Sequence, residues 1–173
     1  YYKKYNKLKK SEESALEQLE KNDEELQYLY SVLTNIENCE SYTEIDDIKE
    51  ELISTGYVRK RKSNGKNSKK SKSSKPLHFV SSDGIDIFVG KNNIQNDYLS
   101  LKFANKNFMW LHTKNIPGSH VIICSNDVPD KTLVEGATLA AYYSKAKDSS
   151  KVPVDYTLVK NLKKPNGANP GMV

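Results

Sequence analysis

A segment of eighteen residues near the middle of the chain limits the fold more than any other feature. Residues 59–76 contain nine lysine and arginine side chains, no acidic residue and no large apolar side chain. Such a segment cannot bury enough apolar surface to form a core, so we expect a basic, disordered linker. The linker separates two regions with different apolar patterns. We therefore divide the chain into an arm (residues 1–58), a linker (residues 59–76) and a domain (residues 77–173).

Charge follows the same division. The arm has seven lysines and fourteen acidic residues, a net charge of −7, whereas the domain carries +3. The +9 of the linker therefore exceeds the formal net charge of the whole chain, which is +5. A cluster of this kind can neutralise phosphates without sequence preference, but a solvated spacer has the same composition.

Apolar side chains recur through the first 36 residues at alternating steps of four and three. Nine of the eleven positions counted from Tyr1 are apolar, namely Tyr1, Tyr5, Leu8, Ala15, Leu19, Leu26, Leu29, Leu33 and Ile36. This spacing predicts a long helix with a coiled-coil seam, which needs a partner helix. The partner is either a second copy of the chain, giving a dimer, or an arm that precedes Tyr1 in a longer protein. A single amphipathic helix packed on the domain is the simpler alternative.

A shorter helix is expected to follow the long one. Thr43 is a candidate N-cap before an acidic first turn, and Gly56 stands where a left-handed C-terminal cap would be. Ile45, Ile48 and Leu52 would form the apolar stripe of this helix.

Beyond Pro76 the pattern predicts an α+β domain of order ββαββαβ, with helices laid on one mixed sheet. The Asp83-Gly84 pair favours a tight hairpin turn, and Thr132 with Glu135 forms a candidate capping box. The expected strands are residues 78–81, 85–89, 109–113, 120–124 and 152–159, and the expected helices are residues 92–104 and a segment from 132 to 143.

Several classes of function are disfavoured. The chain has no nucleophile elbow, P-loop, zinc-protease or dinucleotide fingerprint, so we expect a protein that is not catalytic alone. It has no apolar run of about 18 residues that could span a membrane and no visible secretory signal. Cys39 and Cys124, the only cysteines, lie far apart, which favours a reducing, cytoplasmic setting.

Two small clusters could hold a ligand. His112, His120 and Cys124 lie within thirteen residues, but packing is the more common use of such side chains, and we expect no metal or cofactor. The run Gly90-Lys91-Asn92-Asn93 leaves a strand and enters a helix. It could grip a phosphate through unpaired N–H groups, or simply turn the chain and cap the helix; the spacing leaves both open.

Aromatic and basic side chains occur together around one turn. Trp110, His112, Lys114 and His120 surround the segment 116–119. Lys145 and Lys147 follow the last helix, within a further group of lysines. Stacking combined with phosphate contact is how proteins bind unpaired RNA, although Trp110 in an apolar strand also suits a core.

Five stretches of the domain together resemble the NFACT-R domain of the NFACT family. They are residues 90–97 (GKNNIQND), 110–121 (WLHTKNIPGSHV), 140–147 (AAYYSKAK), 154–157 (VDYT) and 164–171 (KPNGANPG). The family includes bacterial ribosome quality control factors that have long been described as fibronectin-binding proteins. The arm is similar in position and style to the descending arm of the family's antiparallel coiled coil.

The resemblance implies a function that composition does not. It implies a fragment that binds RNA and the large ribosomal subunit carrying an obstructed nascent chain, together with tRNA, and that belongs to a factor promoting template-free alanine tailing. Where the family usually has Arg after the first Gly, this chain has Lys91, which keeps the charge but loses the bidentate fork. Phe108 replaces a usual acidic residue.

Eight motif-bearing polar side chains are the predicted RNA contacts: Lys91, Asn92, Asn93, His112, Lys114, His120, Lys145 and Lys147. The alternative function, from a different class, is a cell-surface, adhesin-like module that binds fibronectin or another matrix protein. The family's older name motivates it, and the lack of a signal or anchor in the sequence argues against it.

Overall fold

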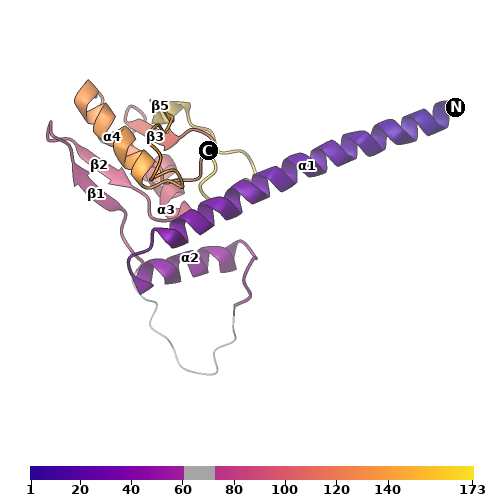
Figure 1. The fold of residues 1–173 in the computed structure, drawn as a ribbon, viewed down its shortest axis with the longest axis horizontal. Helices are drawn as coiled ribbons and strands as arrows, with labels where there is room; N and C mark the ends of the chain where they lie inside the picture. Colours follow the sequence, from indigo (N-terminus) through magenta and orange to yellow (C-terminus); the bar gives the residue numbers. More distant parts are fainter. Residues whose placement is uncertain (61–72) are drawn as a thin grey trace.

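The computed structural model describes residues 1–60 and 73–173, so most of the predicted linker lies outside the described residues. Two helices form the arm: α1 (Tyr2–Glu37) and α2 (Tyr42–Ser54). The first half of α1 projects away from the rest of the molecule, while its second half lies beside α2 and the domain (Figure 1). The predicted long helix is therefore confirmed. Within the two described ranges, no helix is both long and apolar enough to cross a membrane.

The predicted cap of α2 was wrong by two residues. Ser41 has extended backbone angles, and its side chain accepts a hydrogen bond from the backbone N–H of Glu44. Thr43 already lies inside the helix. The prediction for Gly56 is confirmed, because its φ of +88° is the left-handed conformation that favours glycine after a helix.

The domain is built on one antiparallel sheet of order β1-β2-β4-β3-β5. Its strands are β1 (Leu77–Val80), β2 (Asp86–Val89), β3 (Met109–Thr113), β4 (Val121–Ile123) and β5 (Val154–Leu158). The helices are α3 (Asn93–Tyr98), continued by a π-helical turn η1 (Leu99–Phe103), then α4 (Asp130–Tyr142) and a 3-10 turn η2 (Val159–Asn161). The α+β class and the order ββαββαβ are confirmed, but the sheet predicted as mixed is antiparallel in every pair of neighbouring strands.

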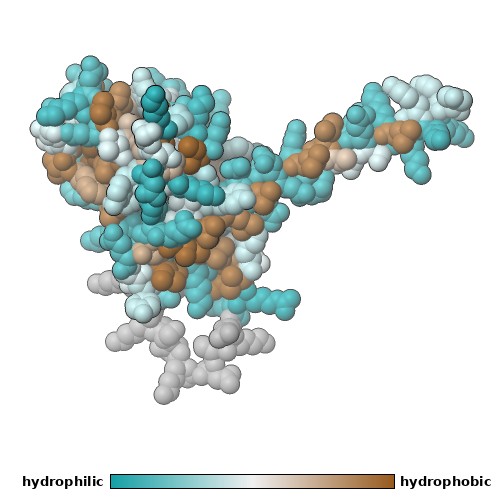
Figure 2. All heavy atoms as spheres, viewed as in Figure 1, coloured by the Kyte–Doolittle hydropathy of each residue, from teal (hydrophilic) through white to brown (hydrophobic). Residues whose placement is uncertain are grey.

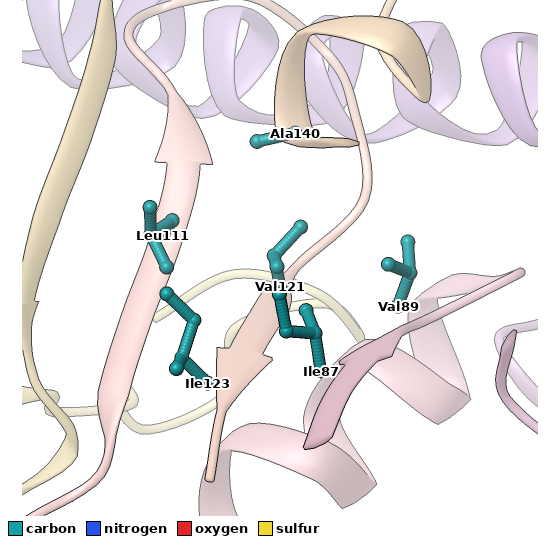
Figure 3. Packing of buried hydrophobic residues seen from close by; sticks show 6 residues of the cluster. All are labelled: Ile87, Val89, Leu111, Val121, Ile123 and Ala140. Atoms are coloured by element: carbon teal, nitrogen blue, oxygen red, sulfur yellow. The ribbon is translucent and has the colours of Figure 1, made fainter. Parts of the chain in front are cut away.

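Helix α4 covers one face of the sheet, and the main core lies beneath it. Strand residues at alternate positions point to this face, as the period of two requires. The fully buried members of the core are Ile87, Val89, Leu111, Val121, Ile123 and Ala140 (Figure 3). Gly136 allows the close approach of α4, because a Cβ there would lie 2.7 Å from Cδ1 of Ile123. The opposite face carries a second cluster, in which Leu99 of η1 packs on Ile122.

The predicted capping box at the start of α4 was also wrong. The helix begins at Asp130 after Pro129 and has no side-chain cap. Thr132 Oγ1 instead donates to Asp83 Oδ2 (2.7 Å), and the backbone N–H of Ser82 donates to Glu135 Oε2 (2.9 Å). Both side chains therefore tie α4 to the β1–β2 hairpin, a contact between segments about 50 residues apart that a local motif cannot reveal.

Candidate nucleic-acid interface

A cleft of about 380 Å³ lies at the joint between the arm and the domain. Helix α1 forms one wall with Gln27, Tyr28 and Ser31, and the sheet forms the other. The sheet wall contains Trp110, His112 and Asp155 together with the β3–β4 turn at residues 115–118. The cleft thus brings together the aromatic motif that the sequence predicted and a part of α1 that the sequence did not connect with it.

Three rings line the sheet wall of the cleft. Trp110 and His112 project from the same face of β3, with ring centroids 5.8 Å apart and planes inclined by 23°. His120, which immediately precedes the neighbouring strand β4, lies edge-on to both, at 5.1 and 5.3 Å. The i, i+2 spacing in β3 explains why the first two rings are stacked.

The two histidines are neutral at physiological pH. His120 is buried; its Nδ1 bonds the hydroxyl of Ser100 (2.8 Å), and its backbone N–H donates to Asn96 Oδ1 (3.0 Å). Burial lowers the pKa of His120 to about 3, and burial also lowers the pKa of His112. These rings can stack and exchange hydrogen bonds, but they do not supply positive charge for phosphate binding.

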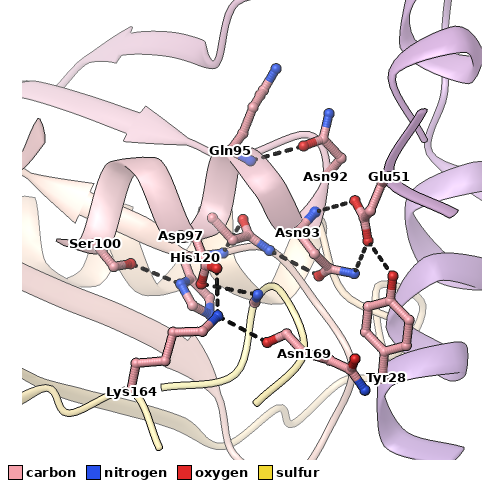
Figure 4. A network of polar contacts seen from close by, with 12 residues as sticks. Tyr28, Glu51, Asn92, Asn93, Gln95, Asp97, Ser100, His120, Lys164 and Asn169 are labelled. Atoms are coloured by element: carbon pink, nitrogen blue, oxygen red, sulfur yellow. Dashed lines mark hydrogen bonds and ion pairs between the residues drawn. The ribbon is translucent and has the colours of Figure 1, made fainter. Parts of the chain in front are cut away.

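A buried carboxylate fastens the arm to the domain beside the cleft (Figure 4). Glu51 of α2 accepts hydrogen bonds from the hydroxyl of Tyr28 (3.0 Å), the backbone N–H of Asn93 (3.2 Å) and the side-chain amide of Asn93 (3.0 Å). The same amide donates to Ser31 Oγ of α1 (2.9 Å). Burial raises the pKa of Glu51, while these donors act in the opposite direction. We call Tyr28, Glu51 and Asn93 the latch.

The run from Gly90 to Asn93 turns the chain and caps α3, which confirms the second of the two interpretations left open above. Asn92 accepts a hydrogen bond from the backbone N–H of Gln95 (2.8 Å), as an N-cap does. Lys91 forms a 2.5 Å ion pair with Glu44 of α2. The polar groups of this run are therefore occupied by bonds within the chain.

The last of the five motifs, residues 164–171, bonds to α3. Lys164 pairs with Asp97 Oδ2 (2.5 Å) and donates to the carbonyl of Asn169 (3.0 Å), and the backbone N–H of Gly171 donates to Asp97 Oδ1 (3.0 Å). Figure 4 shows these contacts next to His120. They hold the C-terminal segment, which includes Gly171, against the cleft.

The eight predicted contact residues divide by exposure. Lys114, Lys145 and Lys147 are exposed, Lys91 and His112 are half-buried, and Asn92, Asn93 and His120 are buried. The structure thus places most of these eight residues around the joint between arm and domain, but leaves only some of their side chains accessible. For the three buried side chains, the bonds described above show a structural task; a direct RNA contact, as predicted for them, would need an exposure that they do not have.

The exposed lysines lie close to the joint. Lys114 follows Thr113 and precedes Asn115, two residues that line the cleft, and its ammonium is 3.9 Å from Asp155. Lys145 is held by a backbone hydrogen bond to Pro117, and its ammonium lies 4.6 Å from the ring centroid of Tyr30 on α1. Lys147 is exposed two residues further on.

Two further observations concern the acidic and metal-binding types of side chain. In residues 1–60 and 73–173, no three histidine, cysteine or acidic side chains are grouped so as to hold a metal ion. Nothing in the sequence singles out Glu51, because one acidic residue in an acidic helix has no distinguishing signal. Its place beside Ile48 and Leu52, on the apolar stripe of α2, was the one available indication.

Comparison with known proteins places both parts of the chain. Residues 1–71 match the family model for the NFACT N-terminal and middle domains, and residues 75–173 match the model for the NFACT protein RNA binding domain. The whole chain is 45% identical to "Rqc2 homolog RqcH" of Bacillus subtilis (strain 168) and to the protein of the same name from Streptococcus suis (strain 05ZYH33). It spans 30% and 31% of the lengths of these relatives.

A solved structure agrees with this placement. The C-terminal region of the fibronectin/fibrinogen-binding protein from Streptococcus suis (FBPS) superposes with a TM-score of 0.91 at 44% sequence identity, over 99% of this chain and 68% of that one. The resemblance that the five sequence motifs indicated is therefore confirmed, and the chain belongs to the NFACT family.

Proposed function

We propose that this chain binds RNA of the large ribosomal subunit, as part of a ribosome-associated quality control factor. The observation that carries the proposal is the position of Lys114 and Lys145 at an aromatic cleft, within a region that matches an RNA binding domain. Exposed ammonium groups supply phosphate contacts, and the rings supply surfaces on which bases can stack.

The resemblance of the five sequence motifs to the NFACT family implies a more specific form of the proposal. In it, the longer protein recognises large subunits with an obstructed nascent chain together with tRNA and promotes alanine tailing in the cytoplasm. This chain contributes binding and positioning and catalyses no reaction alone. The arm would contribute by pairing its seam with another helix, either of the longer protein or of a second copy.

Titration of fluorescently labelled chain with large ribosomal subunits, with tRNA and with heparin tests the proposal. Each titration is made at two salt concentrations. We expect affinity for the subunit to fall steeply with salt, because each phosphate contact on a single strand contributes about −0.7 to the logarithmic slope. Heparin should bind more weakly than the subunit at the higher salt concentration.

Equal affinity for heparin and the ribosome would contradict the proposal. Fibronectin, the partner in the name of the Streptococcus suis protein, serves as the comparison ligand. Saturable binding to fibronectin together with no ribosome binding would favour the adhesin-like alternative.

A further inference from the structure

The cleft at the joint has the shape and chemistry of a site for a flat ring. Its volume of about 380 Å³ lies in the range of pockets that hold small organic ligands. The indole of Trp110 and the imidazole of His112 form one wall, nearly parallel to each other, and both keep part of their surface exposed. The facing wall is α1, so that a ring entering the cleft would lie between helix and sheet.

The remaining groups of the cleft fit the edge of a nucleobase. Gln27 and Asn115 each carry one acceptor and two donors, and Asp155 adds a carboxylate acceptor. Bases present both donors and acceptors on their edges, so these amides can pair with any of them while the carboxylate favours an exocyclic amine. Because the pKa values of His112 and His120 are lowered, these two imidazoles add no positive charge to the cleft near neutral pH.

The surroundings of the cleft fit a base that is attached to a sugar-phosphate backbone. Lys114 lies between two lining residues and is exposed, and Lys145 is fixed to the β3–β4 turn by its backbone bond to Pro117. Phosphates on either side of an inserted base could therefore reach positive charge. A base within a duplex could not enter, because its two faces are covered by its neighbours.

We infer that this cleft takes one unpaired nucleobase of a single-stranded RNA segment, stacked on Trp110 and His112, with the adjoining phosphates at Lys114 and Lys145. The inference rests on the proposed RNA binding. It adds the class of ligand, an unpaired nucleobase, and the cleft in which that base binds. RNA loops and ends would be recognised in preference to continuous duplex.

Trp110 is the one tryptophan of the sequence, so its fluorescence reports directly on the cleft. The full chain is titrated with three probes of equal length: a single-stranded RNA, the same strand as a duplex, and an abasic ribose-phosphate oligomer. Stacking contributes enough that the single strand should bind about five- to a hundredfold more tightly than the abasic oligomer, with saturable quenching of Trp110. The other two probes should leave the emission of Trp110 unchanged.

A variant that fills the cleft from the helix side provides the second arm of the test. Gln27→Phe changes an exposed residue of α1, so the fold should be kept while the space opposite Trp110 is occupied. We expect it to lose the five- to hundredfold preference for bases but to keep salt-dependent binding. Gln18→Phe, at an exposed position of the same helix outside the cleft, should behave as the unmodified chain.

The outcomes separate this inference from the proposed function. Equal affinity for the single strand and the abasic oligomer, with no quenching and steep salt dependence, would overturn the nucleobase site and leave ribosome binding intact. The nucleobase site would also be overturned if Gln27→Phe and Gln18→Phe changed the quenching of Trp110 to the same extent. No binding to any RNA or to ribosomes would overturn both.

Discussion

Helix α1 has two apolar faces that the structure treats differently. The inner face, with Tyr28 and Val32, is buried against α2 and the domain. The outer face is the seam that the heptad spacing predicted, and Leu26, Leu29, Leu33 and Ile36 on it are 37–50% exposed. Figure 2 shows a hydrophobic band that runs along α1 and broadens where α1 meets α2.

The difference shows that regular spacing and burial are separate properties. The seam is regular but has no partner among the described residues, whereas the inner face is irregular and mixes apolar contacts with the polar latch. A regular seam favours pairing with a second helix that also follows the heptad repeat. The inner face fits only this domain, because its bonds depend on the position of Asn93.

The largest effect is expected from removing the carboxylate of the latch. Glu51→Ala leaves the hydroxyl of Tyr28 and the two N–H donors of Asn93 without their acceptor, in a buried place. Buried donors without partners cost about 1–3 kcal/mol each, so we expect a loss of about 3 kcal/mol in the free energy of unfolding. Urea denaturation followed by circular dichroism measures it. Glu50→Ala, at the exposed neighbouring position, is the control; equal effects of the two changes would mean that the latch does not hold the inner face.

A pH effect follows from the burial of His120. The unfolded chain protonates this side chain near its ordinary pKa of 6.5, while the folded chain does so only near 3. The unfolded state therefore binds more protons between these values, and stability falls as the pH is lowered through this window. From pH 7 to pH 5 we expect a loss of roughly 2 kcal/mol from this group.

The contribution of His120 must be separated from that of Glu51, whose raised pKa has the opposite sign. Comparing the unmodified chain with His120→Gln isolates it, since glutamine does not titrate. The difference in unfolding free energy between the two proteins should shrink as the pH falls from 7 to 5. A constant difference would show that His120 is protonated at its ordinary pKa in the folded state.

A smaller loss of stability is expected from removing the ion pair between the arm and the turn that joins β2 to α3. Lys91→Ala leaves the largely buried carboxylate of Glu44 without its cationic partner, with backbone N–H donors such as that of Glu40 remaining, and should cost about 1.5 kcal/mol. Thermal melting of Lys91→Ala beside Lys102→Ala, an exposed lysine, measures the difference. A melting temperature equal to that of the control would mean that the pair contributes nothing.

Substitutions on the seam should have the smallest effect on the free energy of unfolding, in clear contrast with those in the latch. Leu29→Glu combined with Leu33→Glu changes two exposed side chains, so the stability of the monomer should change by no more than about 0.5 kcal/mol per site. If the seam pairs two copies of the chain, the double change should abolish their association, which sedimentation velocity over a range of concentrations measures. A large loss of monomer stability would mean that the outer face is packed within the chain.

Much of the fold could be predicted because its signals are local. The helix predicted from the heptads of α1, the left-handed Gly56 and the hairpin at Gly84 each depend on neighbouring residues, and all three agree with the structure. The predictions failed where a side chain bonds a distant segment. Thr132 has the spacing of a cap, but Asp83 competes successfully for its hydroxyl.

The candidate site was predicted in the same uneven way. The motif around residues 110–120 gave the rings of the cleft, because their spacing along β3 and β4 sets which face they share. The opposite wall came from α1, about 80 residues earlier, and no sequence pattern joins the two. Burial also could not be judged from motif membership, so Asn93 and His120 were taken for surface groups.

Ribosome binding by a variant that lacks the exposed cations of the joint tests the central claim most directly. Lys114, Lys145 and Lys147 are replaced together by alanine, and affinity for large subunits is compared with that of a variant in which the exposed Lys102, Lys106 and Lys160 are replaced. If the joint is the RNA surface, the first variant should lose affinity at least about tenfold more than the second and have a shallower salt dependence, by roughly 2 in logarithmic slope. Equal loss in both variants, with both folded, would contradict the account.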